Sequence, residues 1–297
     1  MNIEHVGVVG LGTMGRALSE SLIAAEHSVA VWDRHADRIA TTAMLGAAPS
    51  VNPRELAGQT SLVFLALPNP TAVREVLYDE EIGVLAGLRE GALIIDMTTG
   101  DPELAEEVAN RVKDLGRGAH YIDAPVSGKP PQLTVMVGGS PGALGDAESI
   151  VADVAGAIIY AGALGMGFAT KLTHQHVKYA THLAVAEALV IAQRVGLDIP
   201  TTIEAIELST GVEGGLKGVV EYFSGNARAV AKHAPTTTIA KDMRLATALA
   251  ESVGVSSATL AAAYAFFGEA AEGAYAKRPY PETIARLEEL RTVPQEA

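Results

Sequence analysis

The sequence predicts two domains, an open α/β domain over residues 1–162 and an all-helical domain over residues 163–297. In the first part, short apolar and β-branched runs alternate with helical patterns, which is typical of parallel strands in βαβ units. In the second part, helical periodicity dominates. The charge divides in the same way, with 10 Lys/Arg against 21 Asp/Glu in the first part (net −11) and 12 against 14 in the rest (net −2). This asymmetry favours two domains with different roles.

The α/β domain is expected to have a strand at each apolar run, namely 6–9, 29–32, 61–67, 92–95, 120–122 and 133–137. Helical patterns occupy gaps between them, at 16–25, 71–77 and 102–115. Asp101 and Pro102 suit the N-cap and the first position of the last of these helices. The uncharged stretch 154–170 contains four glycines and is shorter than the roughly 20 apolar residues that cross a bilayer. It predicts a strand, a turn and the start of a helix.

The second domain is expected to be built from helices at 169–195, 199–208, 216–223, 238–253, 257–276 and 281–290. The first of these helices would be roughly 40 Å long at 1.5 Å per residue. Its many alanines suit a helix that joins the two domains and contributes to a subunit interface, so we expect a homodimer or a homotetramer. The tail after Thr292 is expected to be disordered.

Composition excludes several classes of function. The chain has no cysteine, so it cannot form disulfides or a cysteine zinc cluster. No helical His-x-x-x-His pair occurs among His174, His176 and His182, and no metal site is expected. The net charge of −13 argues against nucleic-acid binding, which needs a basic face. Glu4 stands where a signal peptide would be basic; we therefore expect no membrane partner and a cytoplasmic location.

The glycine-rich segment after the first strand predicts a dinucleotide site. It supplies Gly-x-Gly-x-x-Gly at the opening of a helix, through Gly10, Leu11, Gly12, Thr13, Met14 and Gly15. Such a loop turns tightly, lets backbone amides approach a pyrophosphate and packs the helix closely on the strand. Asp33 ends the second strand, where a carboxylate that binds the ribose is expected. This pattern indicates a Rossmann-type domain that binds NAD, although Arg34 could hold the 2′-phosphate of NADP.

Other strand ends carry further candidates, because ligands of open α/β sheets bind at the carboxyl ends of the strands. Leu67 and Pro68 could pack against the cofactor, and the Thr98 hydroxyl could approach the nicotinamide. Ser127 and Gly128 offer a hydroxyl and free amides that could cradle a carboxylate, although the residues of the segment 123–131 alone favour a proline-rich surface turn. On the long helix, Gln175 is expected one turn after Lys171 on the same face.

Taken together and in order, GLGTMG, IDMTTGDP, DAPVSG, Gly-x-Gly-x-x-x-Lys and KDMRLA resemble the β-hydroxyacid dehydrogenase family, which includes 3-hydroxyisobutyrate dehydrogenase. The resemblance implies a Rossmann domain joined by a long helix to an all-helical domain. It implies that Lys171 is the catalytic lysine, that Ser127 and Gly128 hold the substrate carboxylate and that Lys241 lies near the cofactor. The implied activity is hydride transfer between a nicotinamide cofactor and a small β-hydroxy acid, or its semialdehyde or keto partner.

The departures from the family pattern lie around the substrate. Gln175, preceded by His174, replaces the family's asparagine, and Lys129 replaces the second glycine after Ser127. Lys129 could be a second cation for an anionic substrate or a solvated side chain. Two alternatives remain open. Imine reductases share this architecture, but they generally replace the lysine, so Lys171 favours alcohol chemistry; a non-catalytic dinucleotide-binding scaffold would be expected to have lost Lys171.

Overall fold

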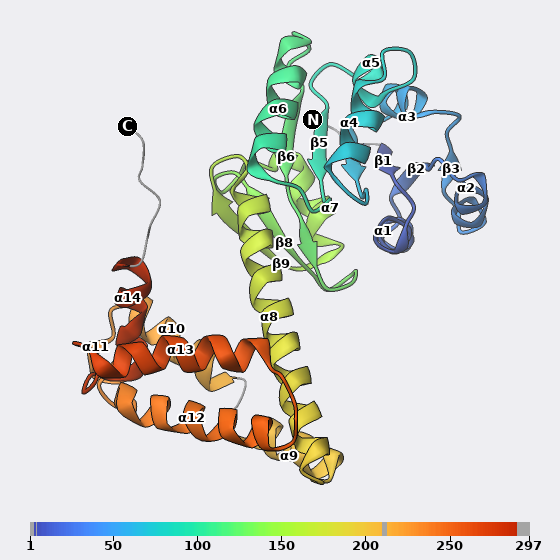
Figure 1. Cartoon of the computed structure of the whole chain (residues 1–297). Helices are drawn as coiled ribbons and strands as arrows, with labels where there is room; N and C mark the ends of the chain where they lie inside the picture. The colour runs from blue at the N-terminus through green and yellow to red at the C-terminus, as the bar shows by residue number, and fades with distance from the viewer. Residues whose placement is uncertain (1–2, 4, 210–212, 290–297) are drawn as a thin grey trace. The chain divides into compact units, whose positions relative to one another are not determined.

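The computed structural model describes residues 3, 5–209 and 213–289. The predicted disorder after Thr292 therefore lies outside the described residues. The chain divides into two compact units, Met1–Gln175 and His176–Ala297 (Figure 1). The first unit has the alternating strands and helices that the sequence predicts, and the second is helical. No helix of the described residues combines the length and the apolar composition that crossing a bilayer requires.

The first unit is built on a six-stranded sheet in which every pairing is parallel. The strands are β1 (His5–Val9), β2 (Ser28–Trp32), β3 (Ala48–Pro49), β4 (Leu62–Leu65), β5 (Leu93–Asp96) and β6 (His120–Asp123). Their order in the sheet is β3-β2-β1-β4-β5-β6, which is the doubly wound order of Rossmann domains and confirms the predicted fold class. The order reverses between β1 and β4, and ligands of such sheets bind at this point.

Helices connect these strands, and several begin at a residue that the sequence marks. The helices are α1 (Thr13–Ala24), α2 (Ala36–Ala43), α3 (Pro53–Gln59), α4 (Pro70–Tyr78), α5 (Val84–Gly87) and α6 (Pro102–Asp114). Asn52, Asn69 and Asp101 each accept a backbone amide of the helix that follows, and a proline comes next in each case. Because these side chains satisfy amides that have no partner inside the helix, they fix where each helix begins. The N-cap predicted at Asp101 is confirmed.

The sheet separates two hydrophobic clusters. Side chains of β4 alternate between them, with Phe64 in one cluster and Val63 and Leu65 in the other. All three side chains are fully buried. A strand that is buried on both faces cannot alternate apolar with polar residues, which explains the continuous apolar runs in the sequence.

A second, three-stranded sheet contains β7 (Val126–Ser127), β8 (Leu133–Gly138) and β9 (Ala155–Gly162), and the short elements η1 (Gly145–Ala147) and α7 (Glu148–Ala152) lie between β8 and β9. The sequence predicted the run 133–137 as a further strand of the α/β domain's parallel sheet, and the structure differs. β7 pairs antiparallel to β8 and β8 pairs parallel to β9. Only residues 124–132 separate β6 from β8, which is fewer than the dozen or more that a crossover to a parallel strand of the first sheet needs. The strand, turn and helix start predicted within 154–170 are confirmed.

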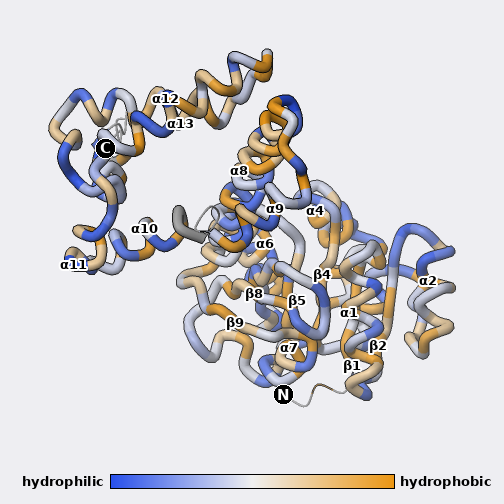
Figure 2. The backbone as a smooth tube through the Cα atoms, turned by 90° about the horizontal axis from the view of Figure 1, so that it is seen from below, coloured by the Kyte–Doolittle hydropathy of each residue, from blue (hydrophilic) through white to orange (hydrophobic). Residues whose placement is uncertain are grey.

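Helix α8 (Met166–Arg194) begins in the first unit and continues into the second. The second unit then contains α9 (Ile199–Leu208), α10 (Glu213–Phe223), α11 (Ala227–Val230), α12 (Thr236–Ser252), α13 (Ala258–Glu272), η2 (Tyr280–Thr283) and α14 (Ile284–Glu289). The helices predicted here are confirmed to within a few residues at their ends. Helices α12 and α13 pack side by side, and Figure 2 shows hydrophobic residues recurring along both. Within this unit, the Glu187 carboxylate accepts hydrogen bonds from Ser257 and Thr259 at the start of α13.

Candidate active site

The glycine loop has the geometry that close approach to a phosphate requires. Gly10 has φ +92°, and a Cβ added there would lie 2.5 Å from the carbonyl oxygen of Ala66. A Cβ at Gly15 would lie 1.8 Å from the carbonyl oxygen of Gly10. Around Gly12, by contrast, no atom lies within 4 Å of the Cβ position. Gly10 and Gly15 are therefore required by packing, whereas Gly12 leaves free space in front of the N-terminus of α1, which attracts anions.

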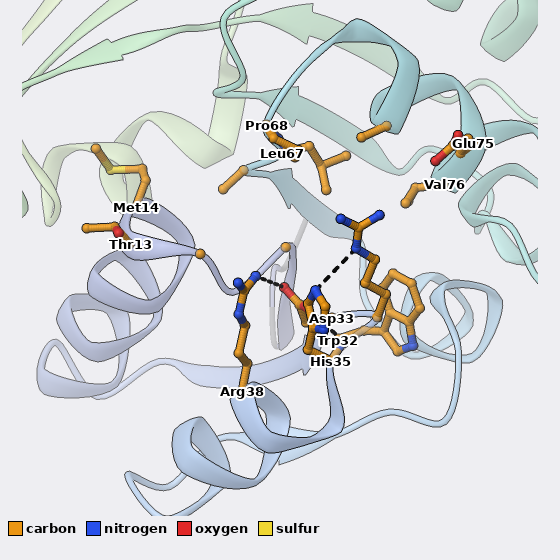
Figure 3. A pocket seen from close by; sticks show the side chains of 15 residues that line it. Thr13, Met14, Trp32, Asp33, His35, Arg38, Leu67, Pro68, Glu75 and Val76 are labelled. Carbon is orange, nitrogen blue, oxygen red and sulfur yellow. Dashed lines mark hydrogen bonds and ion pairs between the residues drawn. The ribbon is translucent and has the colours of Figure 1, made fainter.

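A cavity of about 460 Å³ opens beside this loop. Eight of the predicted cofactor residues line it: Gly10, Gly12, Thr13, Met14, Asp33, Arg34, Leu67 and Pro68. Figure 3 shows Leu67 and Pro68 across the cavity from Asp33. Leu11 and Gly15 do not line it; the Leu11 side chain is buried in the core, and Gly15 packs against Gly10. The cavity thus lies at the switch point of the sheet and fits an extended dinucleotide with an anionic centre.

Asp33 is 6% exposed, and backbone amides hold its carboxylate. Oδ2 accepts the Leu11 N–H at 2.7 Å, and Oδ1 accepts the His35 N–H at 2.8 Å. Arg38 Nη1 lies 3.4 Å from Oδ2 (Figure 3). Because each carboxylate oxygen has two lone pairs, Oδ1 keeps the capacity to accept a further hydrogen bond from a ribose hydroxyl. The same carboxylate also fixes the glycine loop through Leu11.

The cavity includes residues that the sequence analysis missed. His35 and Arg38 add polar side chains beside Arg34, whose Nε lies 3.3 Å from His35 Nε2. Trp32 and Val76 add apolar surface. A signal was present in the charged stretch 33–38, since α2 begins at Ala36 and brings Arg38 back beside Asp33. A helix that begins at Ala36 places Arg38 beside Asp33 in the cofactor cavity.

A buried hydrogen-bond network connects the ends of β4, β5 and β6. Asp96 Oδ1 accepts the Thr98 N–H at 2.9 Å, and Tyr121 donates its hydroxyl to Oδ2 at 2.9 Å. The Leu67 N–H donates to the Thr98 hydroxyl at 3.1 Å, and Thr98 is 2% exposed. Burial raises the pKa of Asp96 to about 6. The network thus orders the Leu67 turn on the cavity wall, and the Thr98 hydroxyl takes part in that task.

Lys171 is a buried lysine, 6% exposed, in the second turn of α8. Buried lysines are uncommon, because taking an ammonium out of water costs free energy. His174 and Gln175 follow three and four residues later, at the spacing of one helical face. His174 Nδ1 and Gln175 Oε1 are buried and have no hydrogen-bond partner. Unsatisfied buried polar atoms are rare in native proteins, and a bound water or ligand would satisfy them.

The remaining predicted residues lie in two places. Ser127 is half-buried at the end of β7, Gly128 has φ +93°, and Lys129 is exposed. Asp123, four residues before Ser127, accepts the Gly165 and Phe168 N–H groups at the start of α8, the helix that carries Lys171. Lys241 lies on α12 in the second unit, with its Nζ 3.0 Å from Asp242 Oδ1. No cluster of three metal-ligating side chains occurs in the described part of the chain.

Comparison with known families agrees with this geometry. Residues 5–162 match the family model described as the NAD binding domain of 6-phosphogluconate dehydrogenase. Residues 165–285 match the model described as NAD-binding of NADP-dependent 3-hydroxyisobutyrate dehydrogenase. The fold and the glycine-loop cavity thus define a protein of the NAD(P)-binding dehydrogenase class, which confirms NAD(P) as the cofactor type. Sequence similarity to individual proteins identifies the particular family.

A probable mitochondrial 3-hydroxyisobutyrate dehydrogenase of Arabidopsis thaliana is 31% identical over 84% of this chain and 78% of its own length. The chain belongs to the 3-hydroxyisobutyrate dehydrogenase family. A probable 3-hydroxyisobutyrate dehydrogenase-like protein of A. thaliana is 35% identical over 70% of this chain, and the mitochondrial 3-hydroxyisobutyrate dehydrogenase of Drosophila melanogaster is 33% identical over 70%. The chain spans 63% and 64% of the length of these last two relatives.

Solved structures share the architecture. The 3-hydroxyisobutyrate dehydrogenase of Mycobacterium tuberculosis, solved with L-serine, has a TM-score of 0.64 at 26% identity and covers 96% of this chain and 99% of its own. An imine reductase from Myxococcus stipitatus, in complex with NADP+, has a TM-score of 0.84 at 21% identity and covers 95% of this chain and 99% of its own. At that identity, the second likeness shows the fold alone.

Proposed function

We propose that this chain is an NAD-dependent oxidoreductase that interconverts a small β-hydroxy acid and its semialdehyde or keto partner, with Lys171 as the proton donor and acceptor. The observation that carries the proposal is the burial of Lys171 beside the unpartnered polar atoms of His174 and Gln175. A solvated surface lysine would not need this environment. The glycine-loop cavity and the family relationship supply the cofactor half of the proposal.

The proposed chemistry needs one hydride acceptor and one base. In the oxidation direction, a nicotinamide cofactor held at the glycine loop and Asp33 would supply the hydride acceptor, and the neutral amine of Lys171 would take the proton of the substrate hydroxyl. In reduction, the Lys171 ammonium hydrogen-bonds the carbonyl oxygen, stabilises the developing negative charge and returns the proton. The cofactor supplies the redox chemistry, and the protein supplies orientation and proton transfer.

Two segments of the first unit, residues 127–129 and 174–175, are proposed to hold the substrate. The Ser127 hydroxyl and the amides around Gly128 would bind its carboxylate, because the positive φ of Gly128 turns the backbone sharply there. His174 and Gln175 would use their unpartnered atoms to bind the rest of the substrate. Lys129, which is exposed, would contribute a cation at the rim. Lys241 is proposed to act near the cofactor.

We propose NAD rather than NADP as the preferred cofactor. Asp33 is held firmly enough to accept a bond from the ribose 2′-hydroxyl, and its charge would repel a 2′-phosphate. Arg34 and Arg38 would favour NADP instead, because both are cations that line the same cavity and could attract a 2′-phosphate. Asp33 and Arg38 form an ion pair in which the aspartate is the more buried partner: 6% of its side chain is exposed, against 46% for the arginine. We therefore expect its charge to be screened less.

The activity test uses purified protein, either cofactor and a panel of β-hydroxy acids, monitored at the nicotinamide absorbance. We expect turnover with at least one acid, and a kcat lower by about 10²–10⁴-fold in Lys171→Ala, because general acid–base catalysis is lost. Lys113→Ala removes an exposed lysine of α6 and should leave kcat unchanged. Absence of turnover in both directions, with cofactor binding intact, would instead indicate a non-catalytic dinucleotide-binding protein.

Reduction of imines is the second candidate, because solved imine reductases share the architecture. Lys171 favours alcohol chemistry over this reaction. The same preparations are therefore assayed with cyclic imines. Imine reduction that survives Lys171→Ala would replace the dehydrogenase proposal with this alternative.

Assembly into a homodimer or homotetramer belongs to the same proposal. The second unit exposes several large apolar side chains, among them Leu183, Val190, Phe223, Leu245 and Leu249. Burying such side chains between subunits would contribute favourable free energy. The cytoplasmic location predicted from the sequence stays a prediction; several relatives carry the word mitochondrial in their names.

A further inference from the structure

Asp123 stands out as a buried carboxylate with no assigned task. It is the last residue of β6 and is 0% exposed. Burial raises its pKa above the usual range, so its position costs free energy that some interaction must offset. That interaction is made with the start of α8. Oδ1 accepts the Gly165 N–H and Oδ2 accepts the Phe168 N–H, each at 2.8 Å.

The surroundings of Asp123 are shaped for this contact. A Cβ added at Gly138 of β8 would lie 1.9 Å from Asp123 Oδ1. A Cβ at Gly167 would lie 2.8 Å from Asp123 Oδ2 and 2.3 Å from the carbonyl oxygen of Met136. Only glycine at these two positions lets α8 lie this close to the strand ends. The carboxylate and the two glycines together fix where the helix begins.

Apolar packing holds the same turn from another side. Phe168 is fully buried in one of the two core clusters of the first unit. Its ring lies against Gly100, where an added Cβ would be 2.8 Å from Cε2. The first turn of α8 is thus held by two charge-assisted hydrogen bonds and by a core aromatic ring. Lys171 follows Phe168 by three residues, less than one helical turn.

We propose that Asp123 is a positioning residue, which sets the place of the Lys171 ammonium by holding the Gly165 and Phe168 amides. The inference rests on the proposed function of Lys171. Catalytic groups are sensitive to placement, and a displacement of about 1 Å can cost roughly 10²-fold in rate. Asp123 itself acts only through α8 and does not exchange protons with the substrate.

Asp123→Asn tests the proposal, because an amide has one acceptor oxygen and the two helix amides are bound by different oxygens. One of those amides must then face the Asn NH2 group. We expect kcat to fall about 10- to 100-fold, with an increased solvent isotope effect on kcat and an unchanged Kd for the cofactor. The isotope effect rises because proton transfer through a displaced lysine becomes rate-limiting. A loss of folded protein alone would lower kcat without changing the isotope effect.

Asp79→Asn is the matched control. Asp79 also accepts two backbone amides, those of Glu81 and Ile82, but both go to the single oxygen Oδ1. Asn can therefore keep both bonds, and the control should retain the kcat and the isotope effect of the wild type. An Asp123→Asn enzyme that matches the wild type in both values would overturn the proposal.

Two further measurements keep the proposal testable. If Asp123→Asn does not fold, Gly167→Ala displaces the same turn through its added Cβ and should give the same kinetic signature; wild-type values in this variant would contradict the proposal. Native-state amide exchange at Gly165 and Phe168 needs no turnover, and we expect it to be faster in Asp123→Asn and unchanged in Asp79→Asn. Unchanged exchange would overturn the inference, whereas lack of wild-type turnover would count against the proposed function alone.

Discussion

At the scale of single residues, three aspartates of the first unit have different roles, although each lies at the end of a strand or directly after it. Asp33 lines the cofactor cavity, Asp96 accepts the Thr98 N–H, and Asp123 holds the start of α8. Each is buried and each accepts at least one backbone amide. Such bonds allow a carboxylate to remain in the interior, where an unpartnered charge would be strongly unfavourable.

Asp33 gives the first prediction. Asp33→Asn removes the charge and keeps one oxygen, which can accept the Leu11 N–H, while the His35 N–H then faces the Asn NH2 group. We expect the ratio of kcat/KM with NAD to that with NADP to fall at least about tenfold, or roughly 1.4 kcal/mol. The measurement is steady-state kinetics with both cofactors. Arg38→Ala, which removes a cation from the same cavity, should move the ratio the opposite way. If neither ratio changes, the 2′ position of the cofactor does not contact this part of the cavity.

Asp96 gives a prediction about stability. Its pKa is raised from 3.8 to about 6 when the chain folds, so between these values the folded chain binds more protons than the unfolded chain. Stability from this group is therefore present at low pH and is lost as the pH rises toward 6. We expect the free energy of unfolding of Asp96→Asn, relative to the wild type, to rise by about 2 kcal/mol from pH 4 to pH 7.5.

Urea unfolding across this pH range measures the Asp96 effect. Asp79→Asn provides the contrast, because hydrogen bonds from Ile82 and Glu81 lower the pKa of Asp79. The stability of that variant relative to the wild type should therefore stay nearly level above the unfolded pKa of 3.8, and should rise only as the pH falls through the lowered pKa of Asp79. A flat difference curve for Asp96→Asn would show that the pKa of Asp96 is the same in the folded and the unfolded chain.

At the scale of helices and strands, the sequence predicted most elements because their signals are local. Continuous apolar runs identified β1, β2, β4, β5 and β6, and Asp101 with Pro102 marked the start of α6. The placement of β8 could not be predicted in this way, since sheet membership depends on the pairing partner and not on the run itself. Similarly, Arg38 reaches the cavity only because α2 begins at Ala36, and the pairing of Asp123 with Gly165 joins residues 42 positions apart.

Helix α6 gives a prediction at this scale. Asp101 Oδ1 accepts the Leu104 N–H at 2.8 Å and caps the helix. Asp101→Ala should lower the free energy of unfolding by about 1 kcal/mol, the typical loss for an N-cap. Urea denaturation measures this change. Asp101→Ser, which restores an acceptor, should recover most of the loss; equal destabilisation by both substitutions would show that the cap contributes little.

At the scale of the whole molecule, the net charge of −13 has a definite location. Most of it belongs to residues 1–162, which include the cavity. An anionic substrate therefore meets a repelling field at long range and must be held by nearby cations and amides. This agrees with a site that relies on Lys171 and on the turn at Ser127 and Gly128.

Assembly gives the last prediction. We expect sedimentation to show a dimer or a tetramer, and Leu245→Glu, which charges an exposed apolar position of α12, to shift the equilibrium toward smaller species. Met44→Glu makes the same kind of change at an 80% exposed position in the first unit and should have no effect. A monomer at all concentrations would refute the prediction.

The close packing of Asp123, Gly138 and Gly167 has a consequence for sequence variation. Because a side chain at either glycine would occupy the space of the carboxylate or the backbone beside it, neither glycine can change alone without moving α8 or Asp123. In a library with all three positions randomised, folded and active members should carry the Asp-Gly-Gly combination or replace all three residues together. The start of α8 thus depends jointly on three positions that are distant in the sequence. Single substitutions would show that each position tolerates little change, but they would not show that the three depend on one another.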